Sequence, residues 1–253
     1  MRISHPALAG MFLAVTGLFA GCAMPPPPPD YIQAAVSDPT RPEADTKRDA
    51  DRKPAQMLGF AQVKPGAVIA DLIPGRGYFT RLFSKVAGPQ GKVYAFIPTE
   101  LDEIYKKNNI PISTAIDPAY ANVRVLHQPI STLTLPEKAD LIWTSQNYHD
   151  MKDKFMGPVD MVRYNKAVFN ALKSGGFYIV LDHSALAGAP ENVTETLHRI
   201  DEATVKKEVL AAGFVLADEN NSLRNPDDPR TKNVFDPSIR GKTDQFVLKF
   251  RKP

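Results

Sequence analysis

Over residues 67–253, short apolar runs alternate with segments in which apolar residues recur every three or four positions. The apolar runs predict strands, and we expect them at 67–72, 92–97, 123–126, 139–144, 177–181, 214–217 and 246–250. The helical spacing between them predicts helices at 79–86, 100–108, 161–172 and 197–212. Such alternation favours one α/β domain of three layers with a mostly parallel sheet.

Residues 42–62 predict one or two charged helices ahead of the first strand. Charges of both signs recur there at helical spacing and would pair along one face; they are Asp45, Arg48, Asp49 and Arg52. The pattern fits either a solvated helix face or a lid over a ligand cleft.

The first 21 residues predict an export signal. Arg2 precedes an apolar stretch, 6–19, that is shorter than the roughly 20 residues needed to span a bilayer. The segment 18–22 resembles the bacterial lipoprotein signal, in which a cysteine, here Cys22, is lipidated and becomes the mature N-terminus; Phe19 stands where that signal usually has leucine. Ordinary cleavage near Ala23 and a retained anchor are the alternatives. Each version places the body outside the cytoplasm, and the lipoprotein version makes it a periplasmic, membrane-anchored protein.

Residues 22–40 predict a linker. The five prolines at 25–29 favour an extended polyproline spacer, and the folded domain is expected over 41–253. We expect contact with the membrane through the N-terminal anchor only.

The composition of the chain excludes some classes of protein. Hydrophobic residues make up 43% of the chain, enough for a sizeable core, and the formal net charge is only +3. Proteins that grip nucleic acid carry a stronger basic excess, so no nucleic-acid partner is expected. A single cysteine excludes an internal disulfide and a multi-thiolate metal site within one chain.

The loop after the first predicted strand, 71–80, contains two glycines. In α/β sheets, ligands bind beyond the carboxyl ends of the strands, and glycines let the backbone approach them closely. A dinucleotide fingerprint would place a third glycine where Thr80 stands and an acidic residue at the end of the second strand, where Ile97 stands. The loop therefore argues against a dinucleotide site.

The same loop resembles the first motif of class I S-adenosylmethionine-dependent methyltransferases, an acidic residue followed by a turn of the form G-x-G-x-G. Asp71, Gly75 and Gly77 match the acidic and the last two glycine positions, while Ile73 replaces the first glycine. Segments resembling later strands and turns of that family follow in the same order, at 91–96, 139–143 and 171–176.

The chain is most similar to exported bacterial proteins classed as predicted methyltransferases. The shared segments are 74–80, 147–150, 198–201 and 240–244. The resemblance implies a Rossmann-like methyltransferase fold with seven strands and a C-terminal antiparallel hairpin. It also implies S-adenosylmethionine as cofactor and a small-molecule acceptor.

Site residues follow from this resemblance. The cofactor would contact the loop at Asp71, Pro74, Gly75, Gly77 and Phe79. The acidic residue that usually binds the ribose hydroxyls has no counterpart at Ile97, which leaves Glu100 as a displaced candidate.

Polar residues after the fourth and fifth predicted strands are the catalytic candidates, because methyl transfer needs a placed nucleophile and sometimes a base. They are Asn147, Tyr148, His149 and His183. Asn147 would contact the acceptor, Tyr148 would stack on it or line the methyl pocket, and His149 would act as base. Alternatively, the cluster only caps the next segment. A metal site built from His149 and His183 with Asp150 or Asp182 is a further alternative, but no recognised ligand spacing supports it, so no metal site is assigned.

The long polar tail at 222–244 is expected to cover a site. Two functions stay open: a methyltransferase acting outside the cytoplasm, and a non-catalytic binding protein that retains the fold.

Overall fold

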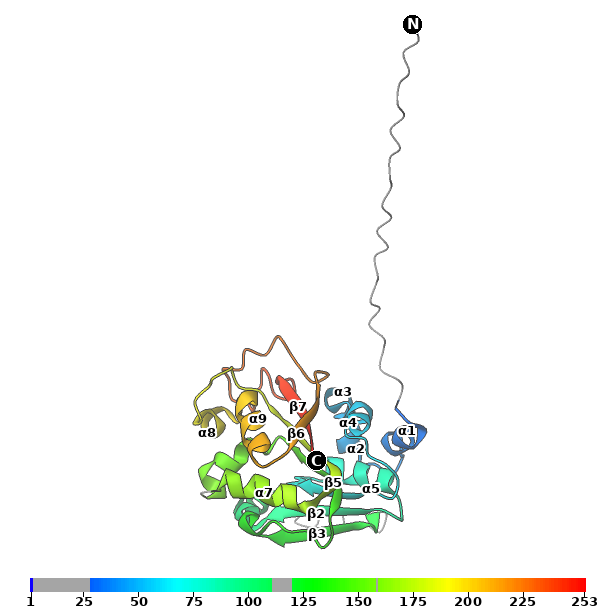
Figure 1. Cartoon of the computed structure of the whole chain (residues 1–253). Coiled ribbons are helices and arrows are strands. Elements are labelled where there is room, and N and C mark those ends of the chain that lie inside the picture. The colour runs from blue at the N-terminus through cyan, green and yellow to red at the C-terminus, as the bar shows by residue number, and fades with distance from the viewer. Residues whose placement is uncertain (2–27, 111–119, 158) are drawn as a thin grey trace.

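The computed structural model describes residue 1 and residues 28–110, 120–157 and 159–253 (Figure 1). All but the first residue of the predicted export signal lie outside the described residues, as do Cys22 and the rest of the first six residues of the predicted linker, 22–27. Among the described helices, none has the length and apolar character needed to cross a membrane.

Seven strands form a single sheet. They are β1 (Val68–Leu72), β2 (Lys92–Pro98), β3 (Val123–Gln128), β4 (Ala139–Ser145), β5 (Leu172–His183), β6 (Val215–Asn220) and β7 (Gln245–Arg251). Their order is β3-β2-β1-β4-β5-β7-β6, and β7 runs antiparallel to both of its neighbours while the other pairs are parallel. This confirms the predicted fold class, including the antiparallel hairpin.

The order of the strands fixes where a ligand can enter. The chain runs outward from β1 through β2 to β3 and then returns to β4 on the other side of β1. The loops leaving β1 and β4 therefore diverge to opposite faces of the sheet and open a crevice between them.

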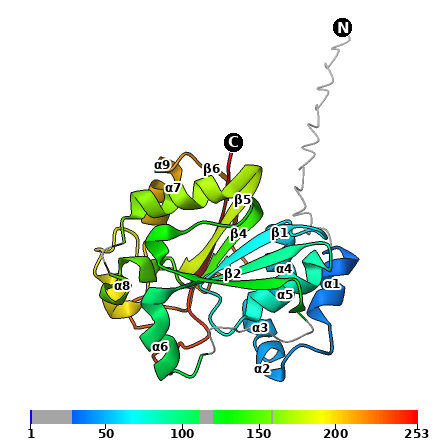
Figure 2. The same cartoon turned by 90° about the horizontal axis from the view of Figure 1, so that it is seen from below.

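Helices cover both faces of the sheet. One face carries α1 (Asp30–Val36), α4 (Pro54–Phe60) and α5 (Tyr78–Ala87), and the other carries α6 (Asp102–Lys107), α7 (Met161–Ala171) and α9 (Glu202–Ala211) (Figure 2). Their apolar residues form two separate core clusters, one on each face. The short helices α2 (Glu43–Thr46), α3 (Asp49–Arg52) and α8 (Val193–Leu197) lie outside these layers.

Two helical segments differ from the prediction. Folded structure begins at α1 instead of near Arg41, because Ile32 and Ala35 are spaced to pack one face of this helix into the core. The helix predicted over 197–212 is interrupted at His198, whose φ of 53° ends α8. Asp201 then caps the N-terminus of α9 by accepting from the amide of Ala203.

The charged segment 42–62 forms three short helices, and its charges pair with other parts of the chain. Asp45 accepts from Arg81 of α5 at 2.7 and 2.8 Å, and both side chains are buried. Asp49 accepts from both terminal nitrogens of Arg41 at 2.7 Å. The segment is thereby fixed beside the carboxyl edge of the sheet.

The tail between β6 and β7 is anchored by a buried ion pair. Arg199 and Asp228 have fully buried side chains, and Nη1 of Arg199 lies 2.8 Å from Oδ2 of Asp228. Arg199 also donates to the carbonyl oxygens of Ser184 and Lys232. The arginine therefore joins the end of β5 to two points of the tail.

We expect Asp228→Ala to lower the free energy of unfolding by about 3–5 kcal/mol, because it leaves a buried guanidinium without its counter-charge. Lys47→Ala is the control: it breaks the exposed 2.8 Å pair with Glu43 and should cost less than about 1 kcal/mol. Urea unfolding followed by circular dichroism measures both. Equal losses in the two variants would contradict the anchoring role.

Candidate functional site

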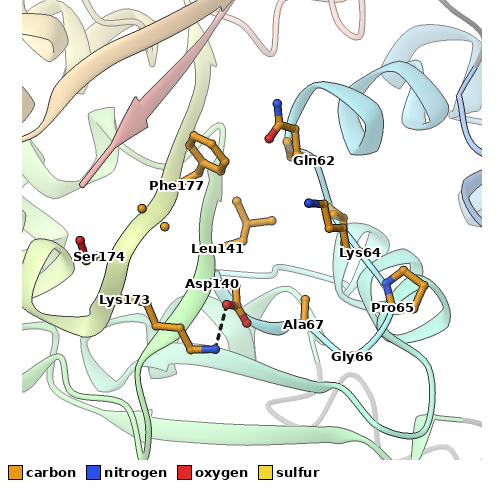
Figure 3. Close-up of a pocket in the computed structure, with 14 residues that line it drawn as sticks. Gln62, Lys64, Pro65, Gly66, Ala67, Asp140, Leu141, Lys173, Ser174 and Phe177 are labelled. Carbon is orange, nitrogen blue, oxygen red and sulfur yellow. Dashed lines mark hydrogen bonds and ion pairs between the residues drawn. The ribbon is translucent and has the colours of Figure 1, made fainter. Parts of the chain in front are cut away.

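Two hollows lie at opposite edges of the sheet. The larger, about 490 Å³, lies at the amino ends of β4 and β5, where Lys173 and Asp140 form a 2.8 Å ion pair (Figure 3). Asp140 also accepts from the backbone amide of Val68 at 2.8 Å, so its carboxylate satisfies the first N–H group of β1. The other hollow, about 410 Å³, lies at the carboxyl edge, where ligands of such sheets bind.

We call this second hollow the loop pocket. Its walls come from α3, from the loop 73–76 after β1, from the start of α5 and from residues 145–147 at the end of β4. Phe235, which is 57% exposed, adds a wall from the tail. A volume of this size suits a small organic ligand. Arg48 and Arg52 of the charged segment and Phe235 of the tail thus line the pocket, while a lid or covering role for these segments stays a prediction.

The backbone of the loop after β1 is wound into the left-handed region. Ile73 has a φ of 55°, Gly75 of 56° and Gly77 of 79°. For a β-branched residue this conformation is strained, so Ile73 adopts the backbone of the glycine it replaces at an energetic cost. A Cβ added to Gly75 would meet no atom within 4 Å, so open space lies against this glycine.

Asp71 stands beneath this loop and is almost fully buried. It accepts from the hydroxyl of Thr80 at 2.6 Å. Burial raises the pKa of Asp71 to about 7, against the lowering effects of Thr80 and Arg52. The residue therefore shapes the loop from below as a carboxyl group that titrates near neutral pH.

Two arginines bring positive charge to the loop pocket: Arg48, which immediately precedes α3, and Arg52, the last residue of α3. Burial lowers the pKa of Arg52 to about 10, with Arg48 adding repulsion, and burial also lowers the pKa of Arg48. The Arg52 guanidinium lies 4.8 Å from the ring centre of Tyr78 and donates to Oε1 of Gln146 at 3.2 Å. Neither arginine forms an ion pair with a residue that the structure describes. Both can therefore receive an anionic group of a ligand.

The polar residues after β4 point in different directions. Asn147 lines the loop pocket and donates to the carbonyl oxygens of Ile73 and Ser145 at 3.0 and 2.6 Å. Tyr148 is fully buried in the core, where its hydroxyl donates to Glu208 and accepts from Asn165. The buried ring of Tyr148 is therefore not placed to stack on an acceptor in the loop pocket.

His149 and His183 come together in a second polar cluster, with ring centres 6.1 Å apart. Nδ1 of His149 lies 2.8 Å from Oδ1 of Asp182 and its Nε2 lies 3.1 Å from Oδ1 of Asp150. Burial opposes the charge on His149, yet the two carboxylates raise its pKa well above its ordinary value. Both ring nitrogens of His149 are engaged by carboxylates, which does not suit the predicted role of a free base. Burial lowers the pKa of His183 to about 3, so this ring stays neutral.

Glu100 lies outside the loop pocket. Both of its carboxylate oxygens accept from the amide of Ile130 at 3.1 Å. The carboxylate caps the 3-10 turn Ile130–Thr132 instead of facing the glycine loop. Among the described residues of the loop pocket, none supplies a carboxylate from the end of β2.

Sequence reasoning missed three contributors to the two sites: the pocket-lining arginines, Phe235 and His198. The helical spacing of Arg48 and Arg52 is compatible with a lid over a ligand cleft, but it does not show that these side chains line the loop pocket. Phe235 is a lone aromatic residue in a polar tail, and that contrast is a usable signal. His198 interrupts a predicted helix, and only the fold shows that its ring lies 5.5 Å from that of His149.

The raised pKa of Asp71 predicts how the free energy of unfolding changes with pH. A carboxyl group whose pKa is higher in the folded than in the unfolded protein contributes stability below its ordinary pKa of 3.8 and loses it as the pH rises to about 7. Asp71→Asn does not titrate, so its free energy of unfolding relative to wild type should rise over this interval by at most about 4 kcal/mol and then level off. Urea unfolding at several pH values measures the difference; a constant difference would contradict it.

No family model matches the chain, and no curated protein matches it in sequence. Many solved structures resemble it. An S-adenosylmethionine-dependent methyltransferase from Aquifex aeolicus is 16% identical, with 83% of this chain and 97% of that one covered and a TM-score of 0.53. An S-adenosylmethionine-dependent methyltransferase from Mesorhizobium loti is 16% identical, with 81% of this chain and 98% of that one covered and a TM-score of 0.51. The N-methyltransferase NodS from Bradyrhizobium japonicum is 10% identical, with 83% of this chain and 98% of that one covered and a TM-score of 0.51. At these identities, the similarity establishes that the chain has the Rossmann-like fold of class I methyltransferases.

Proposed function

We propose that the protein binds S-adenosylmethionine in the loop pocket and methylates a small-molecule acceptor. The observation that carries this proposal is the open space against Gly75, at the switch point of a methyltransferase-type sheet and beside two arginines. The fold of the solved methyltransferases supports the same ligand.

The residues of the pocket divide the work of holding this cofactor. Arg48 and Arg52 would bind the carboxylate of its methionine part, because charged donors and carboxylates form strong hydrogen bonds. Gly75 and Gly77 would let the loop backbone lie against the ligand. The ribose hydroxyls lack the usual acidic partner, since Glu100 is engaged with Ile130, and this gap should weaken affinity.

When bound, the cofactor supplies an electrophilic methyl group, and the chain has to place the acceptor. Asn147 ties the end of β4 to the carbonyl of Ile73 and so fixes one wall of the pocket. Phe235 lines another side of the pocket with an apolar ring from the tail, against which the acceptor could pack.

We further propose that this activity is exercised outside the cytoplasm by a protein anchored through a lipid on Cys22. The basic residue, apolar stretch and cysteine at the N-terminus support this location, as does the resemblance to exported proteins.

A non-catalytic binding protein is the second candidate. The missing ribose partner favours it, as do the internal contacts that occupy Tyr148 and His149. Incorporation of a labelled methyl group into extract components, measured with the purified protein, supports the enzyme. Binding without incorporation supports the second candidate.

We expect Gly75→Val to abolish binding of S-adenosylmethionine, because its side chain would fill the space against the loop. Gly66→Val is the matched control: Gly66 has a φ of 79° and equally open surroundings, but it lies at the opposite edge of the sheet. The backbone strain is therefore similar, while the cofactor site is untouched. Calorimetric titration with S-adenosylmethionine and S-adenosylhomocysteine measures binding. Equal affinities in both variants would refute this placement of the cofactor.

We expect Arg52→Met to weaken binding of S-adenosylmethionine about 10–100-fold, the effect of a lost hydrogen bond to a charged group. Binding of 5′-methylthioadenosine, which lacks the amino-acid part, should be unchanged within about twofold. Arg251→Met is the control, since Arg251 is an exposed arginine at the end of β7 and does not line the loop pocket. If both ligands lose affinity equally, the arginine does not bind the carboxylate.

A further inference from the structure

His149, Asp150 and His198 bring three metal-ligand atoms together beside the loop pocket. Oδ1 of Asp150 lies 3.1 Å from Nε2 of His149 and 3.9 Å from Nδ1 of His198. All three atoms lie within 4.8 Å of one another. The residues come from the 3-10 turn His149–Lys152 and from the end of α8, so the fold, and no local sequence spacing, creates the cluster.

The ring of His149 is oriented as a metal ligand. Its Nδ1 lies 2.8 Å from the fully buried carboxylate of Asp182, which also accepts from the backbone amide of His149 at 2.9 Å. A carboxylate on one ring nitrogen turns the other toward the ion and raises its basicity, an arrangement typical of metal sites. Here the other nitrogen, Nε2, is the one that faces Asp150.

His198 is also held in place. It adopts a left-handed backbone with a φ of 53°, which costs energy for a residue other than glycine. Its ring packs between those of Phe235 and His149, with ring centres 5.0 and 5.5 Å away. The side chain keeps 26% of its surface exposed, which leaves it room for a small movement.

A buried carboxylate beside the cluster has an unsatisfied oxygen. Asp153 is 2% exposed, and its Oδ1 is buried without a hydrogen-bond partner among the described residues. Its Oδ2 lies 3.9 Å from Nδ1 of His198. With Asp150 and Asp182, three carboxylates therefore surround two histidines, and burying this negative charge is costly unless a cation compensates it.

We propose that Nε2 of His149, Oδ1 of Asp150 and Nδ1 of His198 bind a divalent transition-metal ion, with Asp153 beside them as a further carboxylate. Two imidazole ligands favour an ion of the zinc type over Mg²⁺ or Ca²⁺, which prefer oxygen.

The distances suit such an ion after a small adjustment. Ligand atoms bound at about 2.0–2.1 Å in tetrahedral geometry lie about 3.3 Å apart. The 3.1 Å between His149 and Asp150 already matches this value, whereas the 3.9 Å from Asp150 to His198 exceeds it. The third distance, between the two imidazole nitrogens, lies within 4.8 Å, so the ring of His198 has to move by up to about 1.5 Å. This inference stands apart from cofactor binding, because none of its ligands lines the loop pocket.

The test uses the full chain, stripped with a chelator, and Co²⁺ as the probe. We expect wild type to bind one Co²⁺ per chain in equilibrium dialysis, with visible d–d absorption and a raised melting temperature. His198→Asn should weaken binding at least about tenfold and remove the melting shift; asparagine tolerates the left-handed backbone, so folding should be preserved. Asp150→Asn should act in the same way.

His127→Ala is the matched control, because His127 forms a similar 2.7 Å pair with Asp102 away from the cluster. It should bind Co²⁺ as wild type does. Absence of stoichiometric binding in wild type overturns the proposal, and so does His198→Asn binding as tightly as wild type. All measurements omit S-adenosylmethionine, so a failure here is distinct from a failure of the proposed function.

Discussion

The buried carboxylate of Asp182 organises the carboxyl edge of the sheet. Standing at the end of β5, it accepts from the backbone amide and from the ring of His149, and from the amide of His183 at 2.7 Å. A fully buried carboxylate must be satisfied by such donors, so the segment that leaves β4 has little freedom. This constraint turns Asn147 toward the loop pocket and Tyr148 into the core. The division between a pocket and a histidine cluster follows from it.

The pattern of apolar residues was sufficient to predict the strands of the sheet but not to predict which side chains form the sites. All seven strands appear at the predicted positions, and the apolar runs of the central parallel strands β1, β2 and β4 reflect their burial on both faces. β6 is mostly exposed and extends to Asn220, beyond the apolar run at 214–217 that predicted it. The direction of side chains in a turn has no comparable pattern, so Tyr148 and His149 were grouped although they lie in different environments. The glycine loop was predicted in part: its position followed from the sequence, but the left-handed backbone of Ile73 was visible only in the structure.

Opposite charges are kept apart at this edge. The loop pocket carries Arg48 and Arg52, while the cluster beside it carries Asp150 and Asp153. An anionic part of a ligand is therefore attracted to one side and a cation to the other. Phe235 lies between them, since it lines the loop pocket and packs on the ring of His198.

The place of β7 inside the sheet has a consequence for how the chain matures. This strand follows all the others in the chain but lies between β5 and β6, so before residues 245–251 are synthesised β5 has an open edge and β6 lacks its neighbour. Unpaired strand edges leave backbone hydrogen bonds unmade and keep the nascent chain from closing its core. Completion of the fold is thus delayed until after translation of the sheet's last strand. The N-terminal part of the chain therefore cannot complete the sheet alone, because both antiparallel pairings need the last strand.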